Sequence, residues 1–293
     1  MKVALTGATG FIGSHVLTEL QEHGHEVTAL VRDDAQADSV AARGATPAVA
    51  DLYDRPAVAG LLAKADGAIH TASPGDATSA DLDSAVVDAA IAGLAGTGKP
   101  YIQISGLWIY GSNPSITEDS SFNAPALVSW KVPVERRVLG AREMRGVVVV
   151  SGVAYGDGGG GIPGLLLGSP RDDAGHLIML GTGRQHWSTV HVADLADVFR
   201  RVLEDDSARG RYVIGNGLNP TVAELTQAAA VAAGAPGAVP GSDDEARARL
   251  GDYFAEVLLL DQGTNAARAR AELGWHPSHP SLTDEFRHGS YRN

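Results

Sequence analysis

Short runs of β-branched and other apolar residues alternate with longer segments of helical periodicity over the first 150 residues. A strand followed by a helix, repeated at this spacing, predicts βαβ units and hence a parallel sheet with helices on both faces. We therefore expect an α/β fold with a doubly wound parallel sheet, whose ligands bind at the carboxyl ends of the strands. The predicted strands are 3–6, 27–31, 46–50, 68–70, 101–105 and 147–150, and the predicted helices are 11–22, 35–43, 56–65, 81–95 and 126–145.

The pattern becomes less regular after residue 150. Residues 155–163 are rich in glycine and are expected to form a loop. Thr221 and Glu224 are spaced as a capping box, in which each side chain bonds the backbone N–H of the other, so a helix is expected to begin there. The expected elements of this half are helices at 191–203, 221–233 and 265–273 and strands at 212–214 and 257–260.

Composition narrows the classes of ligand. The chain has 293 residues and a formal net charge of −12. An acidic chain without a basic run is a poor partner for nucleic acid or an anionic membrane, so a small molecule is the expected partner. The absence of cysteine excludes disulfides and thiolate nucleophiles. The ten histidines show no metal-ligand spacing, so no metal site is expected. No targeting or membrane-spanning segment stands out, and we expect a cytoplasmic protein.

Three glycines, Gly7, Gly10 and Gly13, follow the first predicted strand and open the first predicted helix. In a dinucleotide-binding loop, the first glycine permits a tight turn and the second lets the backbone approach a pyrophosphate. The third allows the helix to pack closely on the strand. The start of the helix then offers free N–H groups to the phosphates. The strand–loop–helix context predicts a Rossmann-type nucleotide site.

The loop Thr6-Gly7-Ala8-Thr9-Gly10-Phe11-Ile12-Gly13 matches the pattern TGxxGFxG residue for residue. In this loop the chain resembles the extended branch of the short-chain dehydrogenase/reductase superfamily, the NAD(P)-dependent epimerases and dehydratases. The resemblance implies that the loop holds the cofactor and that the segment after the sixth strand borders its nicotinamide. The implied cofactor-binding residues are Gly7, Thr9, Gly10, Phe11, Ile12 and Gly13 of the loop, with Gly152 and Val153 of the later segment.

The end of the second predicted strand bears on the choice of nucleotide, because it carries Arg32 followed by Asp33. A carboxylate there bonds the ribose hydroxyls of NAD and repels the 2′-phosphate of NADP, whereas an arginine binds that phosphate. Since Arg32 comes first, NADP is the expected cofactor and NAD the alternative. The resemblance also implies adenine contacts from Asp51 and Leu52 and diphosphate-ribose contacts from Thr71, Ala72 and Ser73. A helix-capping aspartate and a simple turn are the competing interpretations of these two segments.

The resemblance implies a Tyr-x-x-x-Lys pair on the helix after the fifth strand and a serine or threonine at the strand's end. Ser105 and Lys131 match the serine and the lysine, but position 127, where the tyrosine belongs, is Leu127. An aliphatic side chain cannot carry a proton. The segments SGLWIYG and PALVSW resemble the atypical group of the superfamily, which keeps the fold and nucleotide loop but lacks the usual tyrosine. Lys131 is also expected to bind the ribose, as in the family.

Several other side chains near the expected sheet edge are candidates. Tyr110 follows the fifth strand and Tyr155 the sixth, and for each the competing interpretation is core packing. His186 precedes the segment VHVADLA, which is similar to a family motif, and the competing interpretation is an ordinary polar loop residue. The candidate catalytic residues are therefore Ser105, Lys131 and Tyr110, and the candidate substrate-binding residues are Trp108, Tyr155, His186 and Trp187.

We expect from these residues an NADP(H)-dependent oxidoreductase that acts on a carbonyl or hydroxyl group of a small molecule. The alternatives are a sugar-nucleotide epimerase or dehydratase, a non-catalytic NAD(P)-binding sensor, and a non-redox enzyme on the same scaffold. Residues 1–155, with about 188–215, are expected to form the nucleotide-binding domain. About 156–187 and 216–293 are expected to form a smaller, interleaved substrate-binding region. The resemblance also implies a homodimer through the helices at 81–95 and 126–145.

Overall fold

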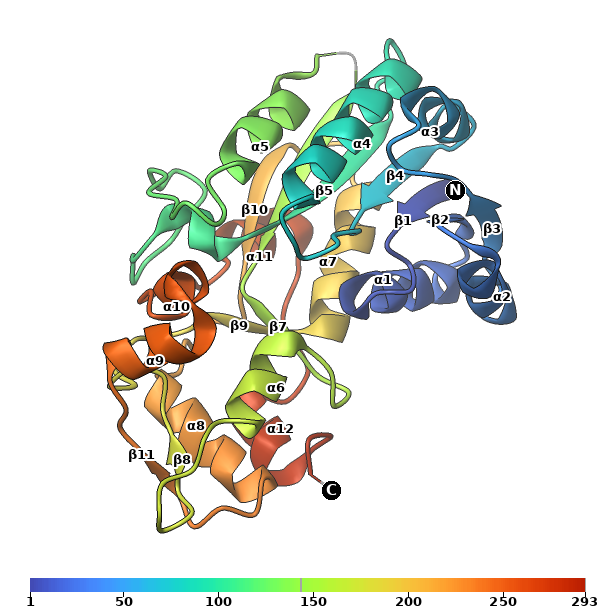
Figure 1. Cartoon of the computed structure of the whole chain (residues 1–293). Coiled ribbons are helices and arrows are strands. Elements are labelled where there is room, and N and C mark those ends of the chain that lie inside the picture. The colour runs from blue at the N-terminus through green and yellow to red at the C-terminus, as the bar shows by residue number, and fades with distance from the viewer. Residues whose placement is uncertain (143, 293) are drawn as a thin grey trace.

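A parallel sheet with helices on both faces dominates the computed structural model, which describes residues 1–142 and 144–292 (Figure 1). The sheet has seven strands in the order β10-β6-β5-β4-β1-β2-β3. The chain builds outward from β1 to β3 and then returns to the other side of β1 with β4. The strand order therefore reverses between β1 and β4, and a doubly wound sheet binds ligands at such a reversal. The strands are β1 (Lys2–Thr6), β2 (Glu26–Val31), β3 (Thr46–Val49), β4 (Gly67–His70), β5 (Pro100–Gly106), β6 (Arg145–Ser151) and β10 (Gly210–Ile214).

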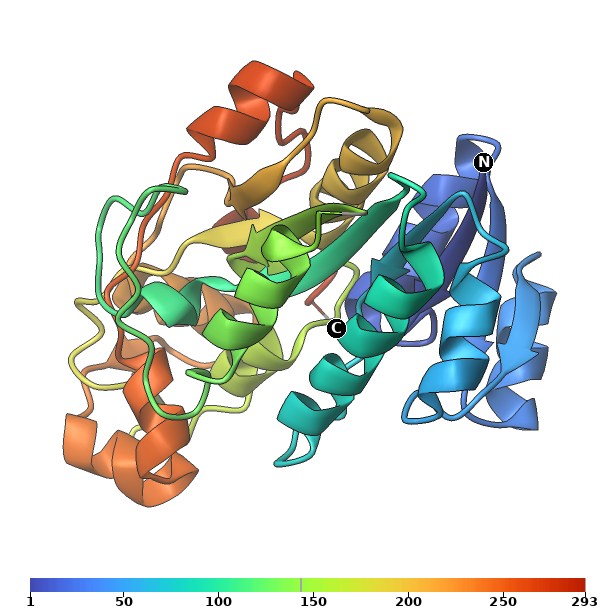
Figure 2. The same ribbon diagram turned by 90° about the horizontal axis from the view of Figure 1, so that it is seen from above.

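Two apolar layers lie on the two faces of the sheet. The continuous valine run of β6 shows why, because Val147 and Val149 enter one core and Val148 and Val150 enter the other. Figure 2 shows α3, α4 and α5 side by side on one face. The helices of that face are α3 (Arg55–Leu62), α4 (Ser79–Leu94) and α5 (Lys131–Gly140), and those of the other are α1 (Phe11–Glu22), α2 (Asp34–Ala42), α7 (Val192–Glu204) and α11 (Ala267–Leu273).

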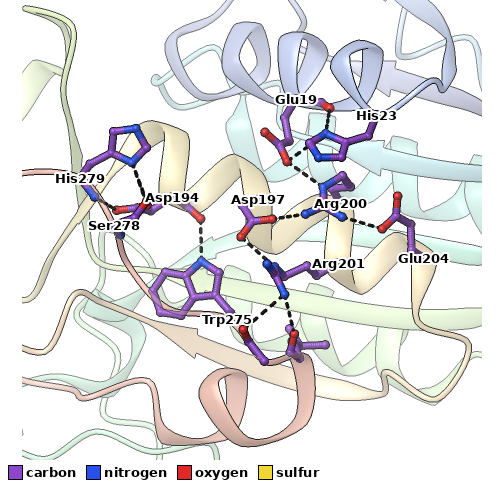
Figure 3. A network of polar contacts seen from close by, with 12 residues as sticks. Glu19, His23, Asp194, Asp197, Arg200, Arg201, Glu204, Trp275, Ser278 and His279 are labelled. Atoms are coloured by element: carbon purple, nitrogen blue, oxygen red, sulfur yellow. Dashed lines mark hydrogen bonds and ion pairs between the residues drawn. The ribbon is translucent and has the colours of Figure 1, made fainter.

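A polar network joins α1 to α7 on the second face (Figure 3). Arg200 bonds Glu19 of α1 and Glu204 of its own helix, each at 2.7 Å. Farther along, the indole N–H of Trp275 donates to the carbonyl of Asp194 at 2.9 Å, and the Asp194 carboxylate lies 2.8 Å from His279. These contacts fix the helix that carries the VHVADLA segment to the rest of the layer.

A third apolar core lies beyond the carboxyl ends of the strands. It includes Trp187, Leu225, Leu258 and Phe286, all buried. Two small parallel sheets accompany it, one of β7 (Val153–Tyr155) with β9 (Thr189–His191) and one of β8 (Leu177–Ile178) with β11 (Ala238–Val239). The helices here are α6 (Gly161–Leu167), α8 (Val222–Ala232), α9 (Asp243–Leu250), α10 (Asp252–Leu258) and α12 (Leu282–His288). Among the described residues, no helix is long and apolar enough to span a membrane.

The α/β fold with a doubly wound parallel sheet is confirmed. The helix at α8 begins as predicted, since Thr221 and Glu224 form the capping box. The predicted strand at 257–260 is wrong, because Val257 and Leu258 end helix α10, where they are buried with Ala255. An apolar run of that length does not distinguish the periods of strand and helix.

The predicted helix at 126–145 is shorter than expected. Residues 126–130 form turns, and α5 covers only Lys131–Gly140. Pro133 therefore lies in the first turn of α5, where backbone N–H groups have no partner within the helix, and its missing donor costs nothing there.

Candidate active site

The glycine loop has the geometry that the spacing predicts. Gly7 has a φ of +78°, and a Cβ there would lie 2.6 Å from the backbone nitrogen of Ala72. A Cβ on Gly13 would lie 2.1 Å from the carbonyl oxygen of Gly7, so both positions require glycine for packing inside the protein. A Cβ on Gly10 would meet only the Gly7 oxygen, at 3.3 Å. The outer side of Gly10 is therefore open to a ligand.

Helix α1 begins at the open side of this loop. Its N-cap is Gly10, which has no side chain to bond the first N–H groups, so those donors point outward without a cap. Thr9 is exposed before the helix, and Phe11 and Ile12 are half-buried in its first turn. An uncapped helix start beside an open glycine is an anion site of the kind that pyrophosphates occupy.

A second glycine-rich loop, residues 156–160, leans on the start of α1. The Phe11 ring lies so close to Gly159 that a Cβ there would come within 2.5 Å of it. The imidazole of His15 lies 2.8 Å from the Asp157 carboxylate. The Tyr291 hydroxyl accepts from the Gly156 N–H at 2.8 Å and donates to the Gly159 carbonyl. This loop therefore joins the first turn of α1 to residues near position 291.

At the end of β2, the two charged residues have different roles. The Asp33 carboxylate caps α2, accepting from the Gln36 N–H at 2.8 Å. The Arg32 side chain is exposed and makes no hydrogen bond or ion pair with any residue that the structure describes. The carboxylate is engaged, and the guanidinium is available for a ligand.

The segment after β4 lies beside the glycine loop, whereas the segment after β3 follows the edge strand of the sheet. Asp51 is exposed and accepts from the Tyr53 N–H at 3.0 Å, and Leu52 is buried. The Thr71 hydroxyl donates to the Thr6 carbonyl at 2.8 Å, which ties the end of β4 to the end of β1. Ala72 packs against Gly7, and Ser73 is exposed at the same edge.

An apolar cleft of about 210 Å³ opens where β5 and β6 end. It contains no charged side chain. Predicted residues that line it are Ile12, Ser105, Trp108, Gly152, Val153 and Trp187, and residues not predicted for the site are Ile104, Gly106, Leu107, Ser151, Ala154, Ile162, Ser188 and Gln262. Because Ile12 belongs to the glycine loop, the cleft adjoins the nucleotide side of the fold.

Four of the candidate catalytic and substrate-binding residues lie outside this lining: Lys131, Tyr110, Tyr155 and His186. Tyr110 is buried and stacks on Phe122 with ring centroids 5.3 Å apart, and burial raises its pKa well above the ordinary value. The Tyr155 hydroxyl donates to the Pro280 carbonyl at 2.8 Å, and burial raises its pKa too. The His186 ring is 46% exposed and lies 2.8 Å from Asp261.

Lys131 belongs to a polar cluster between β4, β5 and α4. Its ammonium lies 3.3 Å from an Asp83 oxygen and 4.3 Å from the centroid of the Trp130 ring. Asp83 also lies 3.2 Å from His70 and from the Gln103 amide. Burial by itself would raise the pKa of Asp83, but the His70 hydrogen bond and the charges of His70 and Lys131 hold it below the ordinary value. Asp83 is therefore an ionised partner that holds Lys131.

The Asp83 cluster continues to the nucleotide loop, because the other nitrogen of His70 lies 2.6 Å from the hydroxyl of Thr6. Side chains two apart on a strand share a face, so Ser105 lies on the same face of β5 as Gln103. The Ser105 hydroxyl is buried and has no partner among residues 1–142 and 144–292. An unpartnered buried hydroxyl is costly, so it is a candidate for contact with a ligand.

Leu127, where the resemblance places the family's tyrosine, lies in the turn before α5 and is 38% exposed. The Trp130 indole N–H donates to its carbonyl at 3.1 Å. Leu127 is not part of the cleft lining. Among the described residues, no three His, Cys, Asp or Glu side chains gather as a metal site would.

Comparison with known sequences identifies the family of this chain. The sequence profile of the NAD dependent epimerase/dehydratase family matches residues 3–215. The chain belongs to this family. It is 28% identical to the epimerase family protein SDR39U1 of Mus musculus, with 96% of this chain and 97% of that protein covered. It is also 28% identical to the 3-diazoavenalumate denitrifying reductase of a Streptomyces species, with 97% and 98% covered. The human epimerase family protein SDR39U1, isoform 2, solved with NADPH, has the same fold, with a TM-score of 0.76, 24% identity and 99% of both chains covered.

Membership of the epimerase/dehydratase family confirms the resemblance inferred from the glycine loop. Several residues of the site were not singled out from the sequence, among them Asp83, Ser188 and Gln262. Asp83 lies in the middle of a helix, and Ser188 and Gln262 belong to no motif. Their positions become meaningful only when the strands and the C-terminal segments come together. For Asp83 one signal was present, a carboxylate among apolar residues of a helix that packs on the sheet.

Proposed function

We propose that this chain is an NADP(H)-dependent oxidoreductase that acts on a carbonyl or hydroxyl group of a small molecule. The observation that carries the proposal is the shared wall of the cleft. Ile12 of the glycine loop lines the same cleft as Ser105 and Val153. A dinucleotide held at the loop would therefore extend toward an apolar cavity large enough for a small substrate.

The residues of the nucleotide side fit the cofactor. The open side of Gly10 and the uncapped start of α1 would hold the diphosphate, and the free guanidinium of Arg32 would hold a 2′-phosphate. NADP is therefore favoured over NAD. The human SDR39U1 solved with NADPH supports the same choice of cofactor. The name of the Streptomyces relative, a reductase, supports the proposed reaction class. When bound, the nicotinamide supplies or accepts the hydride.

In the proposed reaction, the chain itself supplies position and charge. Lys131, held by Asp83, presents an ammonium to the ribose side of the cofactor. The unpartnered hydroxyl of Ser105 orients the substrate oxygen. Leu127 carries no proton, and the buried Tyr110 is stacked outside the cleft, so we assign the proton to an ordered water.

The nucleotide-binding and substrate-binding parts of the chain are proposed as the sequence predicts them. We propose that residues 1–155, with about 188–215, bind the nucleotide, and that about 156–187 and 216–293 bind substrate. We also propose a homodimer through α4 and α5.

The second candidate is a sugar-nucleotide epimerase or dehydratase, favoured by the family to which the chain belongs. Such substrates carry a diphosphate, which arginine or lysine side chains normally neutralise. The cleft has no charged side chain, and this favours the oxidoreductase. A non-catalytic sensor would bind the cofactor and transfer no hydride.

Hydride transfer is the deciding measurement. The purified chain, saturated with NADPH, is offered small aldehydes and ketones while the absorbance of NADPH is followed, and in parallel the chain saturated with NADP+ is offered UDP-glucose. We expect carbonyl-dependent loss of NADPH and deuterium in the alcohol product when the cofactor is deuterated. Conversion of UDP-glucose by the NADP+-loaded chain without net formation of NADPH would favour the epimerase. Tight NADPH binding without turnover of any carbonyl would indicate the sensor.

A further inference from the structure

Gln262 lies where three separate segments of the chain meet at the cleft. Its backbone N–H donates to the His186 carbonyl at 2.9 Å. Its neighbours pair with the loop after β5, since the Asn113 N–H donates to Asp261 at 2.8 Å and the Ile116 N–H to Gly263 at 2.7 Å. Gln262 itself is 4% exposed and lines the cleft. The backbone that carries the Gln262 side chain is therefore held by hydrogen bonds to two other segments of the chain.

The Gln262 amide has a fixed orientation. Its nitrogen donates to the Leu107 carbonyl at 2.7 Å and to the Gly111 carbonyl at 2.8 Å, at the two ends of the short 3-10 helix η1 (Leu107–Tyr110). Carbonyl oxygens only accept, so these two contacts decide which end of the amide is nitrogen. The Oε1 atom accepts no hydrogen bond from any described residue, and it is not among the buried atoms sealed off without a partner. Oε1 is therefore free to accept a hydrogen bond from a molecule bound in the cleft.

The surroundings make this acceptor distinctive. The walls beside it are the side chains of Leu107, Trp108, Ile162 and Trp187. The Trp187 indole N–H is already used by the Leu258 carbonyl at 3.0 Å, and the Ser151 hydroxyl donates to Gly152. The unpartnered hydroxyls of Ser105 and Ser188 also line the cleft, but a hydroxyl can donate as well as accept, whereas Oε1 only accepts. In an apolar cleft without charges, such an acceptor selects for a partner that donates, because an unpaired buried polar group is costly.

We propose that Gln262 determines substrate specificity, with Oε1 accepting a hydrogen bond from an O–H or N–H group of the substrate. The substrate class is a small, uncharged, mainly apolar molecule that carries such a donor in addition to its reacting carbonyl or hydroxyl. The inference rests on the proposed function in taking this cleft as the substrate site. It goes further by naming the residue that recognises the substrate and the substrate group that it recognises.

The test compares probe molecules that differ only in the donor. Phenol is paired with anisole, and benzamide with N,N-dimethylbenzamide, and binding to the NADPH-saturated chain is measured by ligand-observed NMR titration. We expect each donor probe to bind about tenfold more tightly than its methylated partner in the wild-type chain. Equal affinities within both pairs would overturn the proposal without any variant.

Two variants locate the effect. Gln262→Met removes the acceptor, and we expect it to abolish the donor preference. Gln185→Met is the matched control, because Gln185 is also buried and also donates to two carbonyls, those of Leu180 and Leu258, but does not line the cleft. It should keep the preference. A preference retained by Gln262→Met, or lost equally in both variants, would contradict the assignment.

The charge of the substrate is tested with the same assay. UDP-glucose is added as a competitor to bound phenol, and we expect little displacement. Strong displacement would overturn the uncharged class. Because all of these measurements read binding, a chain that keeps the donor preference but reduces no carbonyl would disprove the proposed function alone.

Discussion

At the residue scale, the three glycines of the nucleotide loop illustrate what sequence spacing can and cannot predict. The sequence assigns a turn to Gly7 and close packing to Gly13, and the geometry agrees, since a Cβ on either would come within 2.6 Å of backbone atoms. Gly10 differs because a Cβ there would meet only the Gly7 oxygen, at 3.3 Å, and in the proposed function its restriction comes from the bound diphosphate. Substitutions at the three positions should therefore fail for different reasons.

Gly10→Asp should abolish nucleotide binding without unfolding the chain. Gly10 has an extended backbone, so a side chain is sterically tolerated, but a carboxylate there would repel the diphosphate. We expect the Kd for NADPH, measured by calorimetry, to rise at least about 100-fold. Gly10→Ala is the control for bulk and should bind far better than the aspartate variant. NADPH binding retained by Gly10→Asp would refute the assignment of this loop.

Arg32→Ala should separate the two nicotinamide cofactors. The free guanidinium after β2 has no partner among the described residues, so its removal costs the protein nothing but removes the proposed contact to the 2′-phosphate. We expect the Kd for NADPH to rise about tenfold or more and that for NADH to change little. Equal losses for both would show that Arg32 does not contact the phosphate.

The depressed pKa of Asp83 predicts that the stability of the folded chain depends on pH. Its pKa is depressed in the folded chain, so its contribution to stability is present above the ordinary carboxyl pKa and is lost as the pH falls through the folded pKa. Asp83→Asn should be less stable than the wild type near about pH 6, and the gap should narrow toward about pH 3. Urea unfolding at several pH values measures it, and a gap independent of pH would contradict the prediction.

At the element scale, strong periodicity predicted well and short apolar runs predicted poorly. The alternation of strands and helices identified the six strands of the first half, and the capping box located the start of α8. The segment 257–260 was misassigned because its pattern fits a strand as well as the end of a helix. The helix expected at 126–145 was too long, since residues 126–130 fold as turns before Lys131.

The capping box at α8 carries a measurable part of the stability. The Thr221 side chain accepts from the Glu224 N–H at 3.1 Å, and the Glu224 carboxylate accepts from the Thr221 N–H at 2.8 Å. Thr221→Ala should lower the free energy of unfolding by about 1 kcal/mol, and Thr221→Ser should change it little. Equal destabilisation by both, measured in urea, would mean that the methyl group and not the hydroxyl matters.

At the scale of the whole molecule, the fold class followed from local patterns, but the cleft did not. Gly7, Gly10 and Arg32 lie in contiguous segments whose neighbours explain them. Gln262 depends on segments near positions 107, 186 and 262 meeting in space, and no local pattern contains that information. The Lys131–Asp83 pair similarly joins two helices that are far apart in sequence.

Substitution of Tyr291 tests whether this distant residue holds the loop at residues 156–160 in place. Its hydroxyl bonds the Gly156 N–H and the Gly159 carbonyl, and burial raises its pKa to about 12, so it stays protonated at neutral pH. Tyr291→Phe leaves both backbone groups without this partner and should cost about 2 kcal/mol of unfolding free energy. Tyr253→Phe is the control, since Tyr253 is 64% exposed. Equal effects of the two substitutions on the unfolding free energy would show that the Tyr291 hydroxyl does not hold the loop at residues 156–160.

The meeting of Phe11, Gly159 and Tyr291 also sets an order of events during biosynthesis. The glycine loop is translated long before Tyr291, which bonds the loop at 156–160 that contacts it. A nascent chain therefore lacks part of the wall beside helix α1 until residue 291 has emerged from the ribosome. Cofactor capture is then expected to follow the emergence of residue 291, and a chain stalled before this point should retain NADPH less well than a chain that includes Tyr291.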